Sequence, residues 1–286
     1  MRFQPLETKS FLKRKIVDFI VKAISAVAAC VGIVVLCFIL YEVVSRGVAA
    51  LNIDFFTQLP APPYTEGGGI ANAIVGTFLL TLTATAIGIP VGIFTGIYLA
   101  EFGKDNKFSG AVRFVINILN ASPSIIIGLF VYSIIVLPMG HFSGYSGMVA
   151  LAILMLPVVS SVTEDMINMV PNALRESAYA LGTPCWKVTL QIVFRTAKKG
   201  LITGILLSIA RISGETAPLL FTAFNSPYWS ESFNQPVANM SVTIFNFAMS
   251  PYTDWQQIAW GASLLIMTVI LFTNIFVRVL FQDKKG

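Results

Sequence analysis

Six long apolar segments constrain this chain more than any other feature of its sequence. They lie at about 21–44, 70–100, 112–137, 146–163, 201–224 and 256–281. A helix needs roughly 20 mostly apolar residues to cross a bilayer, so the second segment must tilt or extend past the membrane. Only 12% of the residues are charged, which is far below the share in soluble globular domains. The sequence therefore predicts an all-α, polytopic integral membrane protein with six transmembrane helices.

The distribution of basic residues predicts the side of the membrane on which each loop lies. All but two of the 19 Lys and Arg residues lie in the N-terminal arm, around the loops that follow the second and fourth segments, and at the C-terminal end. The other two are Arg46, in an opposite loop, and Arg211, inside a segment. Positively charged loops stay in the cytoplasm, so we expect both termini there.

This topology divides the chain into four parts. We expect a cytoplasmic arm over 1–19, a first helix and external loop over 20–69, a five-helix transmembrane domain over 70–281 with a cytoplasmic loop at 171–200, and a cytoplasmic tail over 282–286. The first apolar run continues to Val44, which favours a membrane helix over a cleaved signal peptide.

Neither a metal site nor a nucleotide site is predicted within the chain. Its three cysteines have no CxxC spacing, and His141 is its only histidine. No G-x-x-x-x-G-K-[ST] motif is present, so any ATP hydrolysis is expected in a separate subunit. The chain itself is not expected to be an enzyme.

An arginine and a glutamate lie four residues apart inside the fifth apolar segment. Charges inside a membrane are costly and usually mark a path for polar substrates. If the segment were one helix, Arg211 and Glu215 would share a face with Gly204, Ser208, Pro218 and Thr222. The alternative is a buried ion pair that only stabilises packing. We favour a role of the pair in a transport path.

The chemistry of this pair fits an oxyanion. A guanidinium stays protonated and presents a planar set of donors that matches phosphate oxygens. Permeation also requires release, and a lone buried arginine would hold an anion too firmly. We hypothesise that Glu215 competes for the guanidinium of Arg211 and keeps anion binding shallow.

Two further features lie inside apolar segments. Asn120 and Ser122 precede Pro123, where they could line a polar path or could hydrogen-bond the carbonyl that the proline leaves free. The sequence leaves these two possibilities open. In the second segment, glycines recur every fourth residue from Gly88 to Gly96, which predicts a smooth face for close helix packing.

The cytoplasmic loop is predicted to form a helical hairpin. Pro171 begins a short helix, Gly182 ends it, and Thr183-Pro184 begins a second helix. Such a hairpin could be an ordinary surface feature, or its small side chains could insert into the groove of a partner.

Within this loop, Glu176-Ser177-Ala178-x-x-x-Gly182 resembles the EAA loop of binding-protein-dependent ABC importer permeases. The segment Ala210-Arg-Ile-Ser-Gly-Glu-Thr-Ala-Pro-Leu-Leu-Phe-Thr-Ala223 is similar to the fifth span of the permease subunits of phosphate-specific ABC importers, and Ser122-Pro-Ser-Ile125 resembles their third span. Ser177 stands where the family often has Ala, and Phe194-Arg195 replaces the closing Leu-Pro of its pattern. The resemblance covers nearly the whole chain and implies the type I ABC importer fold.

The resemblance also implies an assembly in a bacterial inner membrane. A sister permease would form a heterodimer with this chain and share the path. Two ATPase subunits would bind ATP and Mg and would dock on the loop that contains Glu176, Ser177, Ala178 and Gly182. A periplasmic or lipid-anchored binding protein would deliver inorganic phosphate. Substrate contacts would be expected at Arg211, Glu215, Asn120 and Ser122.

Two alternatives remain from the sequence. The nearer one is an ABC permease for another oxyanion, such as molybdate or sulfate. The more distant one is an ion-coupled carrier, in which Arg211 and Glu215 would relay a proton without any ATPase subunit.

Overall fold

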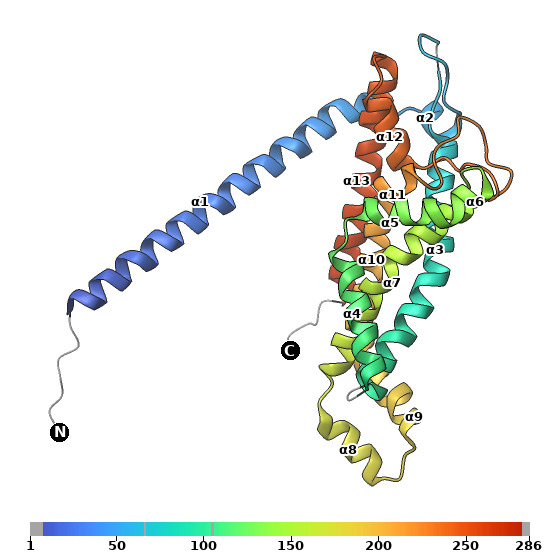
Figure 1. The fold of residues 1–286 in the computed structure, drawn as a ribbon. Coiled ribbons are helices and arrows are strands. Elements are labelled where there is room, and N and C mark those ends of the chain that lie inside the picture. The colour runs from blue at the N-terminus through green and yellow to red at the C-terminus, as the bar shows by residue number, and fades with distance from the viewer. Residues whose placement is uncertain (1–7, 66, 104–105, 282–286) are drawn as a thin grey trace.

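The computed structural model describes residues 8–65, 67–103 and 106–281. The predicted tail 282–286, the first seven residues of the arm, and Lys104 lie outside these ranges. Every regular element in the described part of the chain is helical, which confirms the all-α prediction. Figure 1 shows one elongated bundle with a long N-terminal helix that extends away from it.

Most connections between the elements are short, but residues 58–70 separate α2 from α3 and residues 221–239 separate α11 from α12. The first half contains α1 (Thr8–Gly47), η1 (Val48–Ala50), α2 (Ile53–Thr57), α3 (Ala71–Ile97), η2 (Tyr98–Phe102), α4 (Lys107–Ala121), α5 (Ser124–Val131), η3 (Tyr132–Val136) and α6 (Leu137–Met139). The second half contains α7 (Gly144–Asn168), α8 (Asn172–Ala180), α9 (Cys185–Lys187), η4 (Val188–Val193), α10 (Phe194–Ser213), α11 (Ala217–Leu220), α12 (Met240–Ala248) and α13 (Thr253–Phe281).

The predicted count of six spanning helices is not reached in the described residues. Four helices are long and apolar enough to cross a membrane: Lys13–Ala50, Ala71–Phe102, Gly144–Asn168 and Thr253–Phe276. A fifth candidate is a broken span, Lys107–Ala121 with Ser124–Met139, whose two parts meet at an angle of 108°. The fifth predicted segment, 201–224, begins in α10, whose first turns carry Arg195, Lys198 and Lys199, so the apolar part of this helix is short.

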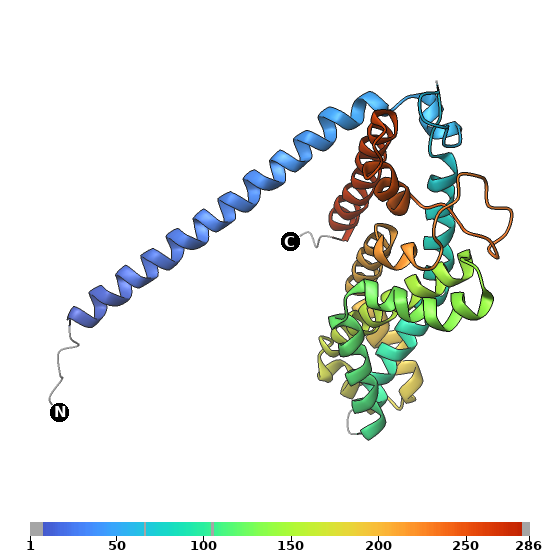
Figure 2. The ribbon, with the colours of Figure 1, turned by 45° about the horizontal axis from the view of Figure 1, so that its top comes forward.

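Helix α1 projects from the bundle and is exposed along nearly its whole length (Figures 1 and 2). It runs without a break through the predicted boundary between residues 19 and 20. Its last turn contacts α13, where the Arg46 guanidinium lies 5.2 Å from the centre of the Trp260 ring. Because residues 23–41 of α1 are apolar on nearly all sides, lipid is a suitable solvent for this stretch, whereas Lys13, Arg14, Lys15, Asp18 and Lys22 precede it.

Helices α3 and α7 form the central packing unit of the bundle. Gly88, Gly92 and Gly96 are all buried at their interface, which confirms the predicted smooth face. A Cβ atom added at Gly92 would lie 2.8 Å from Val159, and one at Gly96 would lie 2.5 Å from Thr163 Cβ. These distances leave no room for a side chain, so the two backbones approach as closely as glycine allows.

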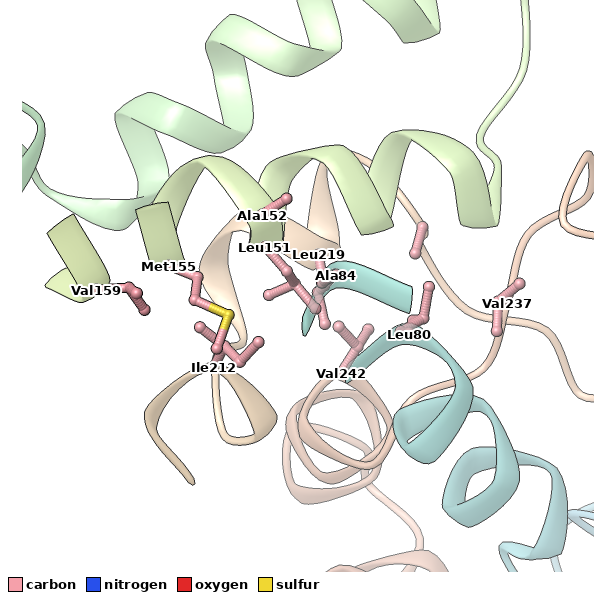
Figure 3. Packing of buried hydrophobic residues seen from close by; sticks show 11 residues of the cluster. Leu80, Ala84, Leu151, Ala152, Met155, Val159, Ile212, Leu219, Val237 and Val242 are labelled. Atoms are coloured by element: carbon pink, nitrogen blue, oxygen red, sulfur yellow. The ribbon is translucent and has the colours of Figure 1, made fainter. Parts of the chain in front are cut away.

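The core around this unit gathers side chains from segments that are distant in the sequence. Figure 3 shows Leu80 and Ala84 of α3 close to Leu151 of α7 and Leu219 of α11, with Val242 of α12 beside them. Ile212, near the end of α10, is also buried in this cluster. The ends of α10 and α11 are therefore fixed by packing against α3 and α7.

Candidate functional site

The helix that contains Arg211 is interrupted between Arg211 and Glu215. Helix α10 ends at Ser213, and α11 begins only at Ala217. The predicted continuous helix over 201–224 is therefore wrong. A helix through this region would contain Gly214, which is a poor helix former, and Pro218, whose ring clashes with the carbonyl one turn earlier.

The break also separates the residues that were expected on one face. Ser208 and Thr222 are buried, whereas Arg211 is exposed, so the predicted single polar stripe is wrong. Gly204 packs against Val162 of α7 instead of facing a path. The polar residues of this segment thus divide into a buried group and an exposed arginine at the end of α10.

Arg211 and Glu215 form a loose pair in the single chain. Arg211 Nε lies 3.7 Å from Glu215 Oε1, which is beyond hydrogen-bond distance. The Arg211 side chain is 57% exposed and that of Glu215 is 16% exposed. The Glu215 side chain is therefore held against the protein, while more than half of the Arg211 side chain remains exposed.

Asn120 and Ser122 lie at the bend between α4 and α5. Asn120 donates from Nδ2 to Ser161 Oγ of α7 at 3.2 Å. The hydroxyl and the backbone N–H of Ser122 both donate to the carbonyl of Ile118, at 2.7 and 2.9 Å. Both bonds end on Ile118, whereas the carbonyl that loses its helical donor to Pro123 is that of Leu119, so Ser122 reinforces the end of α4 and does not replace the missing bond.

The two breaks meet in the fold although their polar residues do not pair. Helix α5 follows the bend at Ser122, α11 follows the break after Glu215, and the two short helices pack together. A Cβ atom added at Gly128 of α5 would lie 2.6 Å from Pro218 Cα of α11. Figure 1 shows this contact in the part of the bundle near α12, far from the α8–α9 hairpin at the other end.

The segment between α7 and α10 forms the predicted hairpin. Helix α8 begins at Asn172 directly after Pro171, and α9 begins at Cys185, directly after Pro184. Gly182 adopts a positive φ of 75°, a conformation that only glycine adopts readily. The predicted boundaries of this hairpin are therefore confirmed to within two residues.

The residues singled out on α8 divide between two faces. Glu176, Ser177 and Gly182 are exposed, as an exposed docking helix requires. Ala178 is only 5% exposed and packs inward against the cluster that contains Val188. Ala178 therefore helps to attach α8 to the bundle and does not belong to its outer surface.

The turn of the hairpin is closed by local contacts. Thr183 N donates to the carbonyl of Ala178 at 3.2 Å. The Tyr179 hydroxyl lies 3.6 Å from Cys185 Sγ, and this hydrogen bond, together with partial burial, raises the pKa of Tyr179 above its ordinary value. The phenol consequently stays neutral at physiological pH.

The sequence interpretation missed two ion pairs near this hairpin. Arg175 of α8 pairs with Glu101 of η2 at 2.8 Å, and both side chains are less than a tenth exposed. Arg113 of α4 pairs with Glu164 of α7 at 2.8 Å. Both arginines entered the sequence interpretation only as indicators of topology. One usable signal was Glu101 itself, a carboxylate at the basic end of an apolar segment.

The sequence also matches a family of transport proteins. The model of the family described as "Binding-protein-dependent transport system inner membrane component" matches residues 88–286. The chain belongs to this family. The permease is 50% identical over 254 residues to the "Phosphate transport system permease protein PstA" of Yersinia pestis, covering 89% of this chain and 86% of that protein. It is 47% identical to the protein of the same name from Haemophilus influenzae, covering 96% and 97% of the two chains.

Solved structures support the same fold. The permease matches a chain of a bacterial ABC transporter involved in alginate import with a TM-score of 0.66 and 14% identity, covering 97% of this chain and all of that one. It also matches a chain of the inward-facing MetNI methionine ABC transporter with a TM-score of 0.59 and 15% identity, over 74% and 92% of the two chains. The permease is therefore a multi-pass membrane subunit with the type I ABC importer fold, and it is not an enzyme.

Proposed function

We propose that this permease forms one half of the translocation path of an ATP-driven phosphate importer. The observation that supports this proposal most is the identity of 43–50% with PstA phosphate permeases over about nine-tenths or more of the chain. An exposed guanidinium at the end of a broken helix is compatible with that substrate, because phosphate is an oxyanion with several strong acceptors.

Arg211 and Glu215 would act together on the passing anion. With 57% of its side chain exposed, Arg211 can face a path shared with a second subunit. Phosphate would compete with Glu215 for the guanidinium, and the nearby carboxylate would favour release, as permeation requires. Asn120 and Ser122 would lie along the same path at the α4–α5 bend, with Ser122 mainly holding the bend in place.

The remaining parts of the importer would be supplied by other chains. A sister permease would complete the path, two ATPase subunits would bind ATP and Mg, and a periplasmic or lipid-anchored protein would deliver phosphate. Glu176, Ser177 and Gly182 on the exposed face of the hairpin would contact the ATPase, with Ala178 behind them. In this proposal both termini lie in the cytoplasm, as the distribution of basic residues predicts.

The proposal is tested by purifying the permease from its native membrane and identifying the chains that accompany it. We expect a second permease and an ATPase. After reconstitution with the binding protein, inorganic phosphate should stimulate ATP hydrolysis and uptake, whereas sulfate and molybdate should not. Uptake that proceeds without an ATPase and stops when the proton gradient collapses would replace the proposal with an ion-coupled carrier.

A further inference from the structure

Helix α8 is attached to the bundle through two of its nine residues. Arg175 and Ala178 are buried, while the other residues of Asn172–Ala180 are exposed. These two positions lie three residues apart and so share one face of the helix. Ala178 offers only a methyl group for packing, so the directional contacts of α8 with the bundle come from Arg175.

The Arg175 guanidinium joins three elements at one point. Its Nε and Nη2 atoms both donate to Glu101 Oε1 of η2, at 3.1 and 2.8 Å. Nη2 also donates to the carbonyl of Ile167 at 2.9 Å, and Nη1 donates to the carbonyl of Val170. The Ile167 carbonyl also accepts from Val170 N at 3.1 Å, so the arginine adds a charged donor to the end of α7 while it binds Glu101.

The elements that Arg175 contacts, η2 and α7, continue into the centre of the bundle. η2 continues α3 without a gap, and α3 and α7 are the pair that packs through the glycine face. Helix α7 contacts α4 through the Asn120–Ser161 hydrogen bond and α10 through Val162 and Gly204. A displacement of α8 would therefore reach the helices that bear the breaks near Arg211.

We propose that the Arg175–Glu101 pair is a positioning joint that converts movement of α8 into movement of α3 and α7. The inference rests on the proposed function, in which the ATPase subunits move α8. An apolar contact at this place would also bury surface, but it would let α8 slide or rotate because dispersion forces have no direction. Charge-assisted hydrogen bonds to three fixed acceptors prevent both motions.

The decisive variant replaces both partners with apolar residues. Replacing a buried ion pair by apolar side chains is often neutral or favourable for stability, so Arg175→Met/Glu101→Leu can retain the fold. The variant is assembled with its partner subunits in proteoliposomes, and phosphate uptake and ATP hydrolysis are measured separately. The readout is the number of phosphate ions transported per ATP hydrolysed, which lost stability alone would not change.

We expect ATP hydrolysis close to the wild-type rate and a phosphate-to-ATP ratio reduced by about tenfold, which lies within the usual range of coupling between sites. The control is Arg46→Lys in the exposed Glu42–Arg46 pair, which should leave the ratio unchanged. If the double variant does not assemble, Glu101→Gln decides by the same ratio. The proposal of a positioning joint would be overturned by any of three results. These are an unchanged phosphate-to-ATP ratio, a parallel loss of phosphate uptake and ATP hydrolysis, or failure of both variants to assemble. Absence of phosphate uptake by the wild type would instead contradict the proposed function.

Discussion

Two arginine–carboxylate pairs in this permease differ in almost every physical respect. Arg175 and Glu101 are 9% and 6% exposed, lie 2.8 Å apart and share further hydrogen bonds with backbone carbonyls. Arg211 and Glu215 lie 3.7 Å apart, and the arginine is 57% exposed. In the first pair every nitrogen of the guanidinium donates a hydrogen bond, whereas in the second the arginine lies beyond hydrogen-bond distance of its carboxylate and is mostly exposed.

This difference indicates which charges hold the bundle and which are available to a substrate. A buried guanidinium must be fully paired, because an unpaired buried charge is strongly destabilising. An exposed guanidinium in a loose pair can exchange its partner for an anion at little loss. The sequence alone makes the second pair look more unusual, but the first pair is the more tightly built.

The largest effect, a loss of stability, is expected from removing one partner of the buried Arg175–Glu101 pair. Arg175→Met leaves the Glu101 carboxylate buried without a partner, which should lower the free energy of unfolding by about 3–5 kcal/mol. The measurement is unfolding of the purified permease in mixed detergent. The double variant Arg175→Met/Glu101→Leu should recover most of this loss. A double variant as unstable as the single one would mean that the carbonyl contacts, and not the charge pair, dominate.

A smaller effect is expected from a change in the Arg211–Glu215 pair, which we call the open pair. This change should affect transport and not stability. A hydrogen bond to a charged group contributes about 1.5–3 kcal/mol, so Arg211→Gln should lower phosphate uptake by about 100-fold at a fixed concentration. Unfolding should be nearly unchanged because the side chain is mostly exposed.

The matched control for Arg211→Gln is Arg46→Gln. Arg46 is 59% exposed and also lies four residues from a glutamate, Glu42, but it is near the end of α1. Uptake by this control should equal that of the wild type. Normal uptake by Arg211→Gln would remove Arg211 from the path.

The α3–α7 contact connects the Arg175–Glu101 pair with the Arg211–Glu215 pair. Its contribution to stability can be tested separately. A Cβ at Gly96 would lie 2.6 Å from the carbonyl oxygen of Ser160, so Gly96→Ala should destabilise the permease by about 1–3 kcal/mol through overpacking. Gly110→Ala is the control, because no atom lies within 4 Å of its added Cβ. In that exposed part of α4, alanine should be neutral or slightly stabilising. Equal effects at both positions would contradict close packing as the cause.

The sequence predicted features that depend on local chemistry. The apolar segments, the glycine spacing from Gly88 to Gly96, and the boundaries of the α8–α9 hairpin all follow from residues within one or two turns of each other. We did not predict the N-caps Asn52, Ser143 and Asn239, although each side chain accepts a hydrogen bond from the first turn of its own helix.

The missed features depend on tertiary contacts or on competing local signals. Arg175 and Glu101 are 74 residues apart, and nothing in their local sequence indicates that they meet. The break near Gly214 was missed because high apolarity suggested a continuous span, while Gly214 and Pro218 favoured interruption. The bend at Pro123 is a similar case, in which the proline was noted but its 108° consequence was not predicted.

The carboxylate of the open pair should affect release more than binding. Glu215→Gln removes the competitor of phosphate for the Arg211 guanidinium, so the anion should bind more tightly and leave more slowly. We expect the phosphate concentration for half-maximal uptake and the maximal rate both to fall, by about tenfold for 1.4 kcal/mol of lost competition. The measurement is uptake over a range of phosphate concentrations. A raised half-maximal concentration would show that Glu215 assists binding instead.

The smallest effect is expected from the most exposed pair, Asp18 and Lys22 on α1. Their side chains are 60% and 74% exposed although their atoms approach to 2.7 Å, as close as those of the buried pair. Exposed ion pairs contribute about 0–1 kcal/mol and are screened by salt, so Lys22→Ala should leave unfolding and uptake nearly unchanged. Both are measured as for Arg175→Met and Arg211→Gln. A large loss in either would mean that distance, and not burial, determines what an ion pair does in this permease, and the contrast between Arg175 and Arg211 would then need another cause.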